Sequence, residues 1–138
     1  MGRILAIDYG SKRCGLAVSD PERIIAGALT TVATDELQDY ITRYITVENV
    51  DQLVIGKPTK VNGEASETMQ LIEPFIKRMK KAFPQLPIEL VDERFTTKLA
   101  FQTMLDAGLS RKARNNKNGT VDRVSATIIL QTYMESIR

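Results

Sequence analysis

The sequence predicts an α/β fold, a five-stranded mixed sheet in which three antiparallel strands are followed by βα units, with helices on both faces. Its N-terminal part holds short apolar runs separated by turn residues, which is typical of antiparallel strands. Farther along, unalternating β-branched runs indicate buried parallel strands, and segments with apolar residues three and four apart separate them. With 138 residues, 43% of them hydrophobic, the chain matches one ordinary globular domain, and we expect residues 1–138 to form it.

The N-terminal strands are predicted to form a meander. Residues 4–8 are a short apolar run closed by Asp8, and residues 14–19 are the expected hairpin partner. Gly10 in the connection supplies the positive φ that a tight turn favours, and residues 28–32 are the third strand. Asp8 is therefore expected at the end of the first strand, beside the turn.

A helix, a strand and a second helix are predicted next. Apolar residues at three- and four-residue spacing indicate a helix over residues 35–47, with Asp35 as a good N-cap type. Residues 52–56 are unalternating and β-branched, which predicts a central parallel strand buried on both faces. The following helix has one apolar face, and Pro74 is expected to kink it or limit its first part. The residues of that face are Met69, Ile72, Ile76, Met79 and Phe83.

The last third of the chain adds one strand and two helices. Residues 87–91 predict a second buried strand, which delivers Glu93 just beyond its C-terminal end. We expect a helix over residues 97–108 and then a basic, Asn-rich loop over residues 109–119. The last helix is predicted from about Val121, with an apolar stripe wide enough to lie on the sheet. The positions of that stripe are Val124, Ile128, Leu130 or Gln131, and Ile137.

The sequence has no histidine, and Cys14 is its single cysteine. Catalysis by Ser-His-Asp or Cys-His groups needs an imidazole base, a zinc site normally needs several Cys or His ligands, and a disulfide needs a second thiol. These chemistries are therefore excluded. An enzyme of this composition works through carboxylates, amines, hydroxyls, main-chain groups or a hard metal ion with oxygen ligands, for which Mg²⁺ or Mn²⁺ is suited.

Three carboxylates are predicted where α/β sheets usually carry their sites: Asp8 ends a strand, Glu93 follows another, and Asp122 begins the last helix. Each alone is explained by a turn, a surface pair with Arg94 or a helix-capping acid. If the first strand is central and the last helix packs beside it, the three acids converge. Two carboxylates about 4 Å apart repel by about 4 kcal/mol at an effective dielectric constant near 20, so a divalent cation is the simplest explanation. Two such ions can promote phosphodiester hydrolysis without histidine.

The net charge of +2 is too small to establish a polyanionic partner, because 19 basic and 17 acidic side chains nearly cancel. Their distribution is more informative, since residues 110–123 hold five basic side chains against the single acid Asp122. Such a run is either a solvated loop or a patch that contacts phosphates. The apolar runs fall far short of the about 20 residues that a membrane-spanning helix needs, so we expect a cytoplasmic protein with no membrane partner.

Four ordered blocks give a specific resemblance to a known family. They are DYGSKRCGLAVSD from Asp8, GKPTKVNG from Gly56, VDERFTT from Val91 and VDRVSATIILQTY from Val121. Together they resemble the blocks of the YqgF family over essentially the full length. The resemblance implies a ribonuclease H-like fold, similar to that of the RuvC-type Holliday junction resolvases. It also implies a nuclease that trims the 5′ end of precursor 16S ribosomal RNA, with ribosome assembly intermediates as potential partners.

The resemblance assigns roles to individual residues. The catalytic and metal-binding acids are Asp8, Glu93 and Asp122. Asp92 and Asp20 are further candidate ligands, although an aspartate before a proline, as Asp20 is, more often is a turn residue. A glycine-rich loop near the site corresponds to Gly56, Pro58 and Gly63. Cationic side chains near these acids and in the basic loop are candidates for phosphate contact. They are Lys12, Arg13, Lys57, Arg94, Arg111, Lys112, Arg114 and Lys117. The loop is less basic than the lysine run of many relatives, which affects substrate grip more than chemistry.

Three alternatives remain open from the sequence. An Asp-x-Gly turn between hairpin strands also resembles the phosphate-binding loop of sugar kinases and actin, although those proteins close two domains around a nucleotide. A second alternative is a module that binds nucleic acid without cutting it. The third is a DNA junction resolvase, which needs two active sites and hence normally a dimer; the sequence leaves the oligomeric state undecided. Divalent-ion-dependent cleavage of one substrate among several would separate them.

Overall fold

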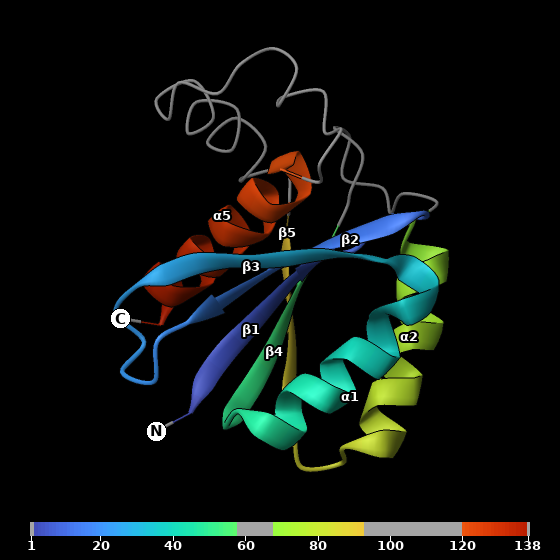
Figure 1. The fold of residues 1–138 in the computed structure, drawn as a ribbon, viewed down its shortest axis with the longest axis horizontal. Helices are drawn as coiled ribbons and strands as arrows, with labels where there is room; N and C mark the ends of the chain where they lie inside the picture. The colour runs from blue at the N-terminus through green and yellow to red at the C-terminus, as the bar shows by residue number, and fades with distance from the viewer. Residues whose placement is uncertain (1, 58–67, 93–119, 138) are drawn as a thin grey trace.

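The computed structural model describes residues 2–57, 68–92 and 120–137 and shows a five-stranded mixed sheet in the order β3-β2-β1-β4-β5 (Figure 1). The strands are β1 (Arg3–Asp8), β2 (Arg13–Ser19), β3 (Ala26–Ala33), β4 (Val50–Lys57) and β5 (Ile88–Asp92). The described helices are the 3-10 turn η1 (Thr34–Glu36), α1 (Leu37–Val47), α2 (Met69–Ala82) and α5 (Thr120–Ser136). The first three strands pair antiparallel, while β1, β4 and β5 run parallel, as predicted.

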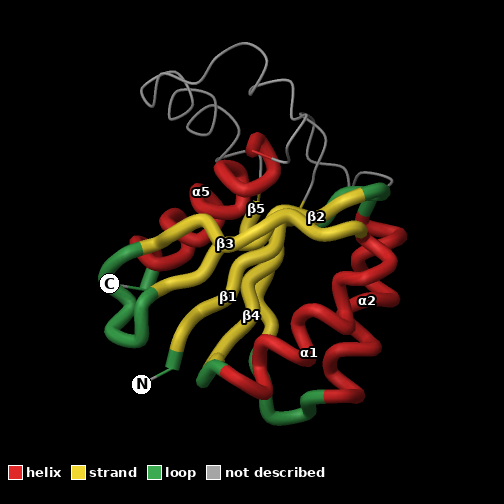
Figure 2. Tube along the Cα trace, viewed as in Figure 1, coloured by secondary structure: helices red, strands yellow, loops and turns green. Residues whose placement is uncertain are grey.

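The alternation of side chains along the central strands creates two cores. Leu5 and Ile7 of β1 face α1 and α2, whereas Ile4 and Ala6 point to the opposite face and pack with α5. Helices therefore cover both faces of the sheet, which confirms the predicted architecture (Figure 2). The α5 side is lined by small residues, because Ala6 and Ala17 of the sheet meet Ala126 of the helix. Small residues on both sides allow the helix to lie close to the strands.

Two helix details differ from the prediction. Asp35 is not an N-cap, because it lies inside η1 and neither η1 nor α1 has a side-chain hydrogen bond at its N-cap. Pro74 neither ends α2 nor limits its first part, since the helix runs from Met69 to Ala82 with Pro74 inside it. The proline side chain is exposed, while Ile72 and Phe75 on either side of it are buried in the core. Packing of this face holds the helix together where one backbone donor is missing.

The last strand and the last helix also need correction. The predicted strand 87–91 was expected to be buried, but β5 is at the edge of the sheet with Glu89 and Leu90 exposed. In the predicted stripe of α5, Ile128 and Leu130 are buried, whereas Gln131 is exposed and Ile137 is half-exposed. The buried side chains of this helix are Ala126, Ile128, Ile129, Leu130 and Met134. The predicted helix 97–108 and loop 109–119 lie outside the described residues.

Candidate active site

The carboxyl ends of the three parallel strands meet at one edge of the sheet. Asp8 is the last residue of β1, Lys57 the last of β4 and Asp92 the last of β5. Lys57 and Asp92 are direct neighbours in the pairing of β4 with β5. Open α/β sheets usually carry their sites at this edge. Asp8, Lys57 and Asp92 therefore lie together at one end of the sheet.

Gly15 is the residue that brings Asp8 and Asp122 together. It lies directly opposite Asp8 in the antiparallel pairing of β1 with β2. By strand alternation Asp8 shares the α5 side with Ala6, and Gly15 shares it with Ala17. A Cβ atom on Gly15 would overlap the main-chain carbonyl of Asp122 and come within 2.8 Å of the Asp122 Cβ. Since only glycine leaves room for α5 here, the start of α5 rests on the strand residue beside Asp8.

Gly15 was not predicted as a site residue from the sequence, although a signal was present. A glycine inside an otherwise apolar strand often marks a close approach of another backbone. Gly15 is such a glycine, and it lies two residues after Arg13, which together with Lys12 was predicted to contact phosphate near the site. What the sequence could not supply was the identity of the approaching segment, which is the first turn of α5.

The thiol of Cys14 lies within the electrostatic influence of both carboxylates. Burial raises the pKa of this thiol, and the negative charges of Asp8 and Asp122 raise it further. Hydrogen-bonding interactions with the Thr34 side chain and with the Gly10 main chain act in the opposite direction and partly offset the rise. Cys14 is fully buried, as is usual for an isolated strand cysteine, which behaves as a small hydrophobic residue.

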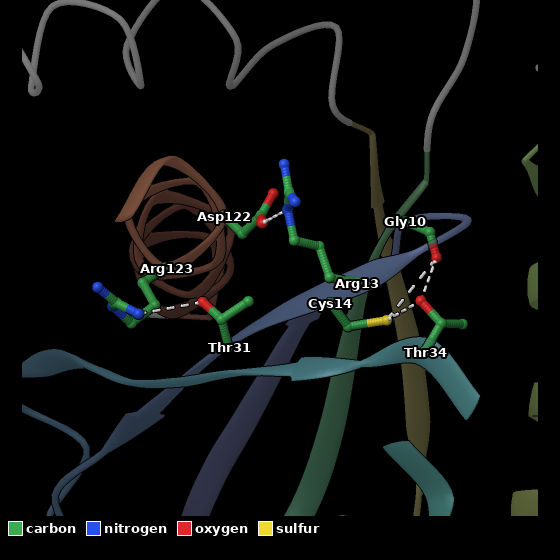
Figure 3. Close-up of polar contacts among 7 residues, drawn as sticks. All are labelled: Gly10, Arg13, Cys14, Thr31, Thr34, Asp122 and Arg123. Carbon is green, nitrogen blue, oxygen red and sulfur yellow. Dashed lines mark hydrogen bonds and ion pairs between the residues drawn. The ribbon is translucent and has the colours of Figure 1, made fainter. Parts of the chain in front are cut away.

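Arg13 forms an ion pair with Asp122 at this edge. Its Nε donates a hydrogen bond to Oδ2 of Asp122 over 2.9 Å (Figure 3). The Arg13 side chain is 50% exposed, whereas that of Asp122 is 19% exposed. The neighbouring arginine of α5, Arg123, is directed elsewhere, because its Nη1 donates to Oγ1 of Thr31 on β3 over 3.2 Å. Arg13 was predicted as a phosphate ligand, and its contact with Asp122 was not foreseen.

The turn between β1 and β2 is fastened to the start of η1. The Thr34 hydroxyl donates a hydrogen bond of 2.7 Å to the Gly10 carbonyl, and the Thr34 amide donates one of 3.0 Å to the Lys12 carbonyl. Cys14 Sγ lies 3.5 Å from the Thr34 hydroxyl and 3.9 Å from the Gly10 carbonyl oxygen (Figure 3). These contacts hold the main chain from which Lys12 and Arg13 extend. Thr34 was not identified from the sequence.

One candidate ligand is placed far from this edge. Asp20 follows the C-terminal end of β2, which is antiparallel to β1, so it lies at the opposite end of the sheet from Asp8. Its Oδ1 accepts hydrogen bonds from the amides of Ile24 and Ile25, over 2.7 and 2.8 Å, and these bonds lower its pKa. Asp20 is therefore a turn residue, as its position before Pro21 favours, and not an additional ligand beside Asp8.

Other predicted site residues lie outside the described part of the chain. They are Glu93 and Arg94 after β5, Pro58 and Gly63 after β4, and Arg111, Lys112, Arg114 and Lys117 before α5. Glu93 and Pro58 immediately follow strands that end where Asp8 lies, and the four basic residues precede α5 in the chain. Their assignments stay predictions.

The chemistry of the described acids suits a hard cation. No group of three His, Cys, Asp or Glu side chains that could hold a metal ion occurs among residues 2–57, 68–92 and 120–137. Asp8 and Asp122 nevertheless both lie next to Gly15 on the face of the sheet that α5 covers. Their carboxylate oxygens are the kind of ligand that Mg²⁺ and Mn²⁺ prefer. Two carboxylates alone would be an incomplete ligand set, so a metal site here would need a further ligand.

Comparison with sequence families gives a match along nearly the whole chain. The model of the RuvX family, described as Holliday junction resolvase, matches residues 2–136. A relative from Bacteroides thetaiotaomicron is 58% identical over 138 residues, which are 100% of this chain and 99% of that protein. A relative from Flavobacterium psychrophilum is 51% identical over 134 residues, which are 97% of each chain. Both relatives have the provisional name pre-16S rRNA nuclease.

Solved structures with a similar fold include two resolvases. RuvC of T. thermophilus, in complex with a Holliday junction substrate, has a TM-score of 0.60 at 12% identity and aligns over 99% of this chain and 98% of its own. The Holliday junction resolvase of fowlpox virus has a TM-score of 0.54 at 14% identity and aligns over 99% of both chains. These likenesses establish a ribonuclease H-like fold. No helix of the described residues is both long enough and apolar enough to span a bilayer.

Proposed function

Because this chain belongs to the RuvX (YqgF) family, we propose that it is a metal-dependent nuclease whose substrate is precursor 16S ribosomal RNA. The observation that carries the proposal is the convergence of Asp8 and Asp122 across Gly15, at the sheet edge where such sites occur. Glu93 is the proposed third acid, because it immediately follows the last residue of β5 at the same edge. The whole of residues 1–138 is proposed to act as one nuclease domain.

The division of labour among the side chains follows from their charge. Asp8, Glu93 and Asp122 would hold the divalent ions, which supply an activated water and stabilise the leaving oxygen when bound. The cations would bind phosphates and position the nucleic acid. The proposed cations are Lys12, Arg13, Lys57 and Arg94, together with Arg111, Lys112, Arg114 and Lys117. Lys12 and Arg13 are exposed at the edge that carries Asp8, which supports this role for them.

The test combines ligand removal with a matched control at the other end of the sheet. Asp8→Asn, Glu93→Gln and Asp122→Asn should each lower cleavage of precursor 16S rRNA more than about 100-fold, because each removes a metal ligand rather than an outer contact. Asp51→Asn makes the same change near the start of β4, and it should leave the turnover of folded protein unchanged. EDTA should stop cleavage without changing the circular dichroism spectrum, since the two apolar cores need no metal to form. Wild-type turnover in any of the three acid variants would remove that residue from the proposed ligand set.

A second candidate function is the resolution of DNA junctions. The description of the matching family model as Holliday junction resolvase favours it. Incubation with precursor rRNA, single-stranded RNA, duplex DNA and a four-way junction, with and without Mg²⁺ or Mn²⁺, would decide between the substrates. Cleavage of the junction alone would replace the rRNA proposal, and binding without cleavage of any substrate would point to a non-catalytic module. If the substrate is precursor rRNA, the proposed activity takes place in the cytoplasm, on ribosome assembly intermediates.

A further inference from the structure

The Arg13–Asp122 contact links a proposed phosphate ligand to a proposed metal ligand. Both residues would otherwise be assigned to separate tasks, yet Nε of Arg13 lies 2.9 Å from Oδ2 of Asp122. A divalent cation that binds Asp122 places a second positive charge at the same carboxylate. Metal and guanidinium therefore compete for Asp122, and like charges this close repel.

Arg13 is suited to leave this contact. Its side chain is 50% exposed, and exposed ion pairs hold their partners weakly, so little is lost when water replaces the carboxylate. Asp122 is only 19% exposed and lies against Gly15, so the carboxylate stays in place while the arginine moves. The hydrogen bond uses Nε–H, which is one of the five N–H donors of a guanidinium. A phosphate can engage the planar fork of donors more fully than this single contact does.

The main chain that carries Arg13 is held while its side chain remains exposed. Thr34 fastens both Gly10 and Lys12, as described above. The backbone of Arg13 is in turn paired with Ala33 at the start of β2. The range of the guanidinium is thus set by its own rotamers about one fixed Cα position, from which it reaches Asp122.

From these contacts we infer that Arg13 is an exchangeable counter-ion: it neutralises Asp122 until a divalent cation binds, and it then transfers to a phosphate of the bound nucleic acid. The inference rests on the proposed function, because it takes Asp122 as a metal ligand. Its consequence is that metal and nucleic acid bind cooperatively, each favouring the state in which Arg13 has left Asp122. Such coupling is reciprocal, so it can be measured from either ligand.

The experiment measures Mn²⁺ binding to the full chain by calorimetry, in wild type, Arg13→Gln and Arg123→Gln. Arg123→Gln is the matched control, because it removes the same charge one residue from Asp122 while the wild-type Arg123 contacts Thr31. Arg13→Gln should bind Mn²⁺ about 5-fold more tightly than Arg123→Gln, because the competing cation is gone. Arg13→Lys, which keeps a charge without the planar fork, should lie between wild type and Arg13→Gln.

A second measurement uses a single-stranded RNA and records its binding immediately after mixing, before cleavage proceeds. In wild type, saturating Mn²⁺ should tighten RNA binding, and Arg13→Gln should lose about 5-fold of that gain. Equal Mn²⁺ affinities in Arg13→Gln and Arg123→Gln, with clear binding to wild type, would overturn the counter-ion role and leave the metal site intact. Failure of wild type itself to bind Mn²⁺ would overturn the proposed function together with this inference. Melting curves of each variant confirm that it is folded.

Discussion

Two arginine–aspartate pairs of the same length lie at opposite ends of the sheet, and their surroundings differ. Arg13 and Asp122 are 2.9 Å apart at the carboxyl ends of the parallel strands, and Arg23 and Asp51 are 2.9 Å apart at the other end. In the second pair, Asp51 Oδ2 also accepts the Gly2 amide over 2.7 Å, and Arg23 Nε donates to the Gly2 carbonyl over 3.3 Å. That pair joins the starts of β1 and β4 to the β2–β3 connection.

The backbone of Arg23 reinforces this contrast. Its φ of 59° is in the left-handed region, which a non-glycine residue adopts at some cost. The turn keeps this conformation because Arg23 is bound through its side chain to Gly2 and Asp51, and through its amide to the Asp20 carbonyl. An ion pair surrounded by main-chain contacts is structural, whereas one between an exposed arginine and an acid next to a second acid is suited to exchange. The distance alone does not distinguish the two roles.

The largest effect is expected from filling the space at Gly15. Gly15→Ala places a Cβ against the Asp122 carbonyl, so α5 must shift, at a cost of about 1–3 kcal/mol in the free energy of unfolding. A shift of about 1 Å in a ligand should lower cleavage about 100-fold. Gly27→Ala is the matched control, because its nearest contact would be the Val18 carbonyl oxygen at 3.9 Å. Chemical denaturation and cleavage rates measure both effects, and equal behaviour of the two variants would contradict the role of Gly15.

The next effect separates the two pairs directly. Asp51→Asn should lower the free energy of unfolding by about 1 kcal/mol, because a charge-assisted contact is weakened at a partly exposed site, and should leave Mn²⁺ affinity unchanged. Asp122→Asn should do the reverse, with Mn²⁺ binding lost and little change in stability. Denaturant titration gives the free energy of unfolding of each variant, and calorimetry gives its Mn²⁺ affinity. If both variants lose stability and neither loses Mn²⁺ affinity, the two pairs have the same structural role.

The parts of the fold set by local patterns were predictable from the sequence. The central strands carry apolar runs because both of their faces are buried, so β1, β2 and β4 were located to within two residues. β5 carries a similar run, but its position at the edge depends on which strands pair, and an apolar run does not reveal that. Met69, Ile72 and Met79 of the buried face of α2 were predicted, whereas buried Phe75 was not.

The candidate site was predictable in its residues more than in its contacts. Asp8 and Asp122 were identified because they end a strand and begin a helix, and both positions can be read from local sequence. The Arg13–Asp122 pair and the Thr34 contacts join residues that are far apart in the chain, so no local sequence pattern predicts them. Gly15 is an intermediate case. A glycine inside a strand can be recognised in the sequence, but the segment that packs against it cannot.

The smallest effect concerns the turn that carries Arg13. Thr34→Val removes the hydroxyl that bonds to the Gly10 carbonyl, which should cost about 0.5–1 kcal/mol in the free energy of unfolding. Thr34→Ser retains the hydroxyl and should restore the hydrogen bond. Because the turn is looser in Thr34→Val, RNA affinity should fall while Mn²⁺ affinity stays near that of wild type. Binding of RNA unchanged in Thr34→Val would show that the turn does not position phosphate contacts.

The docking of α5 on β2 has a consequence for the order of events during protein synthesis. Asp8 leaves the ribosome early with β1, whereas Asp122 belongs to the last described helix and reaches Gly15 only after all five strands have been made. Pairing of such distant segments is a late step in folding, since the loop between them must close first. A growing chain therefore lacks the approach of Asp122 to the strand residue beside Asp8 until α5 has been made. Any chemistry that needs both carboxylates must wait until α5 has docked on β2.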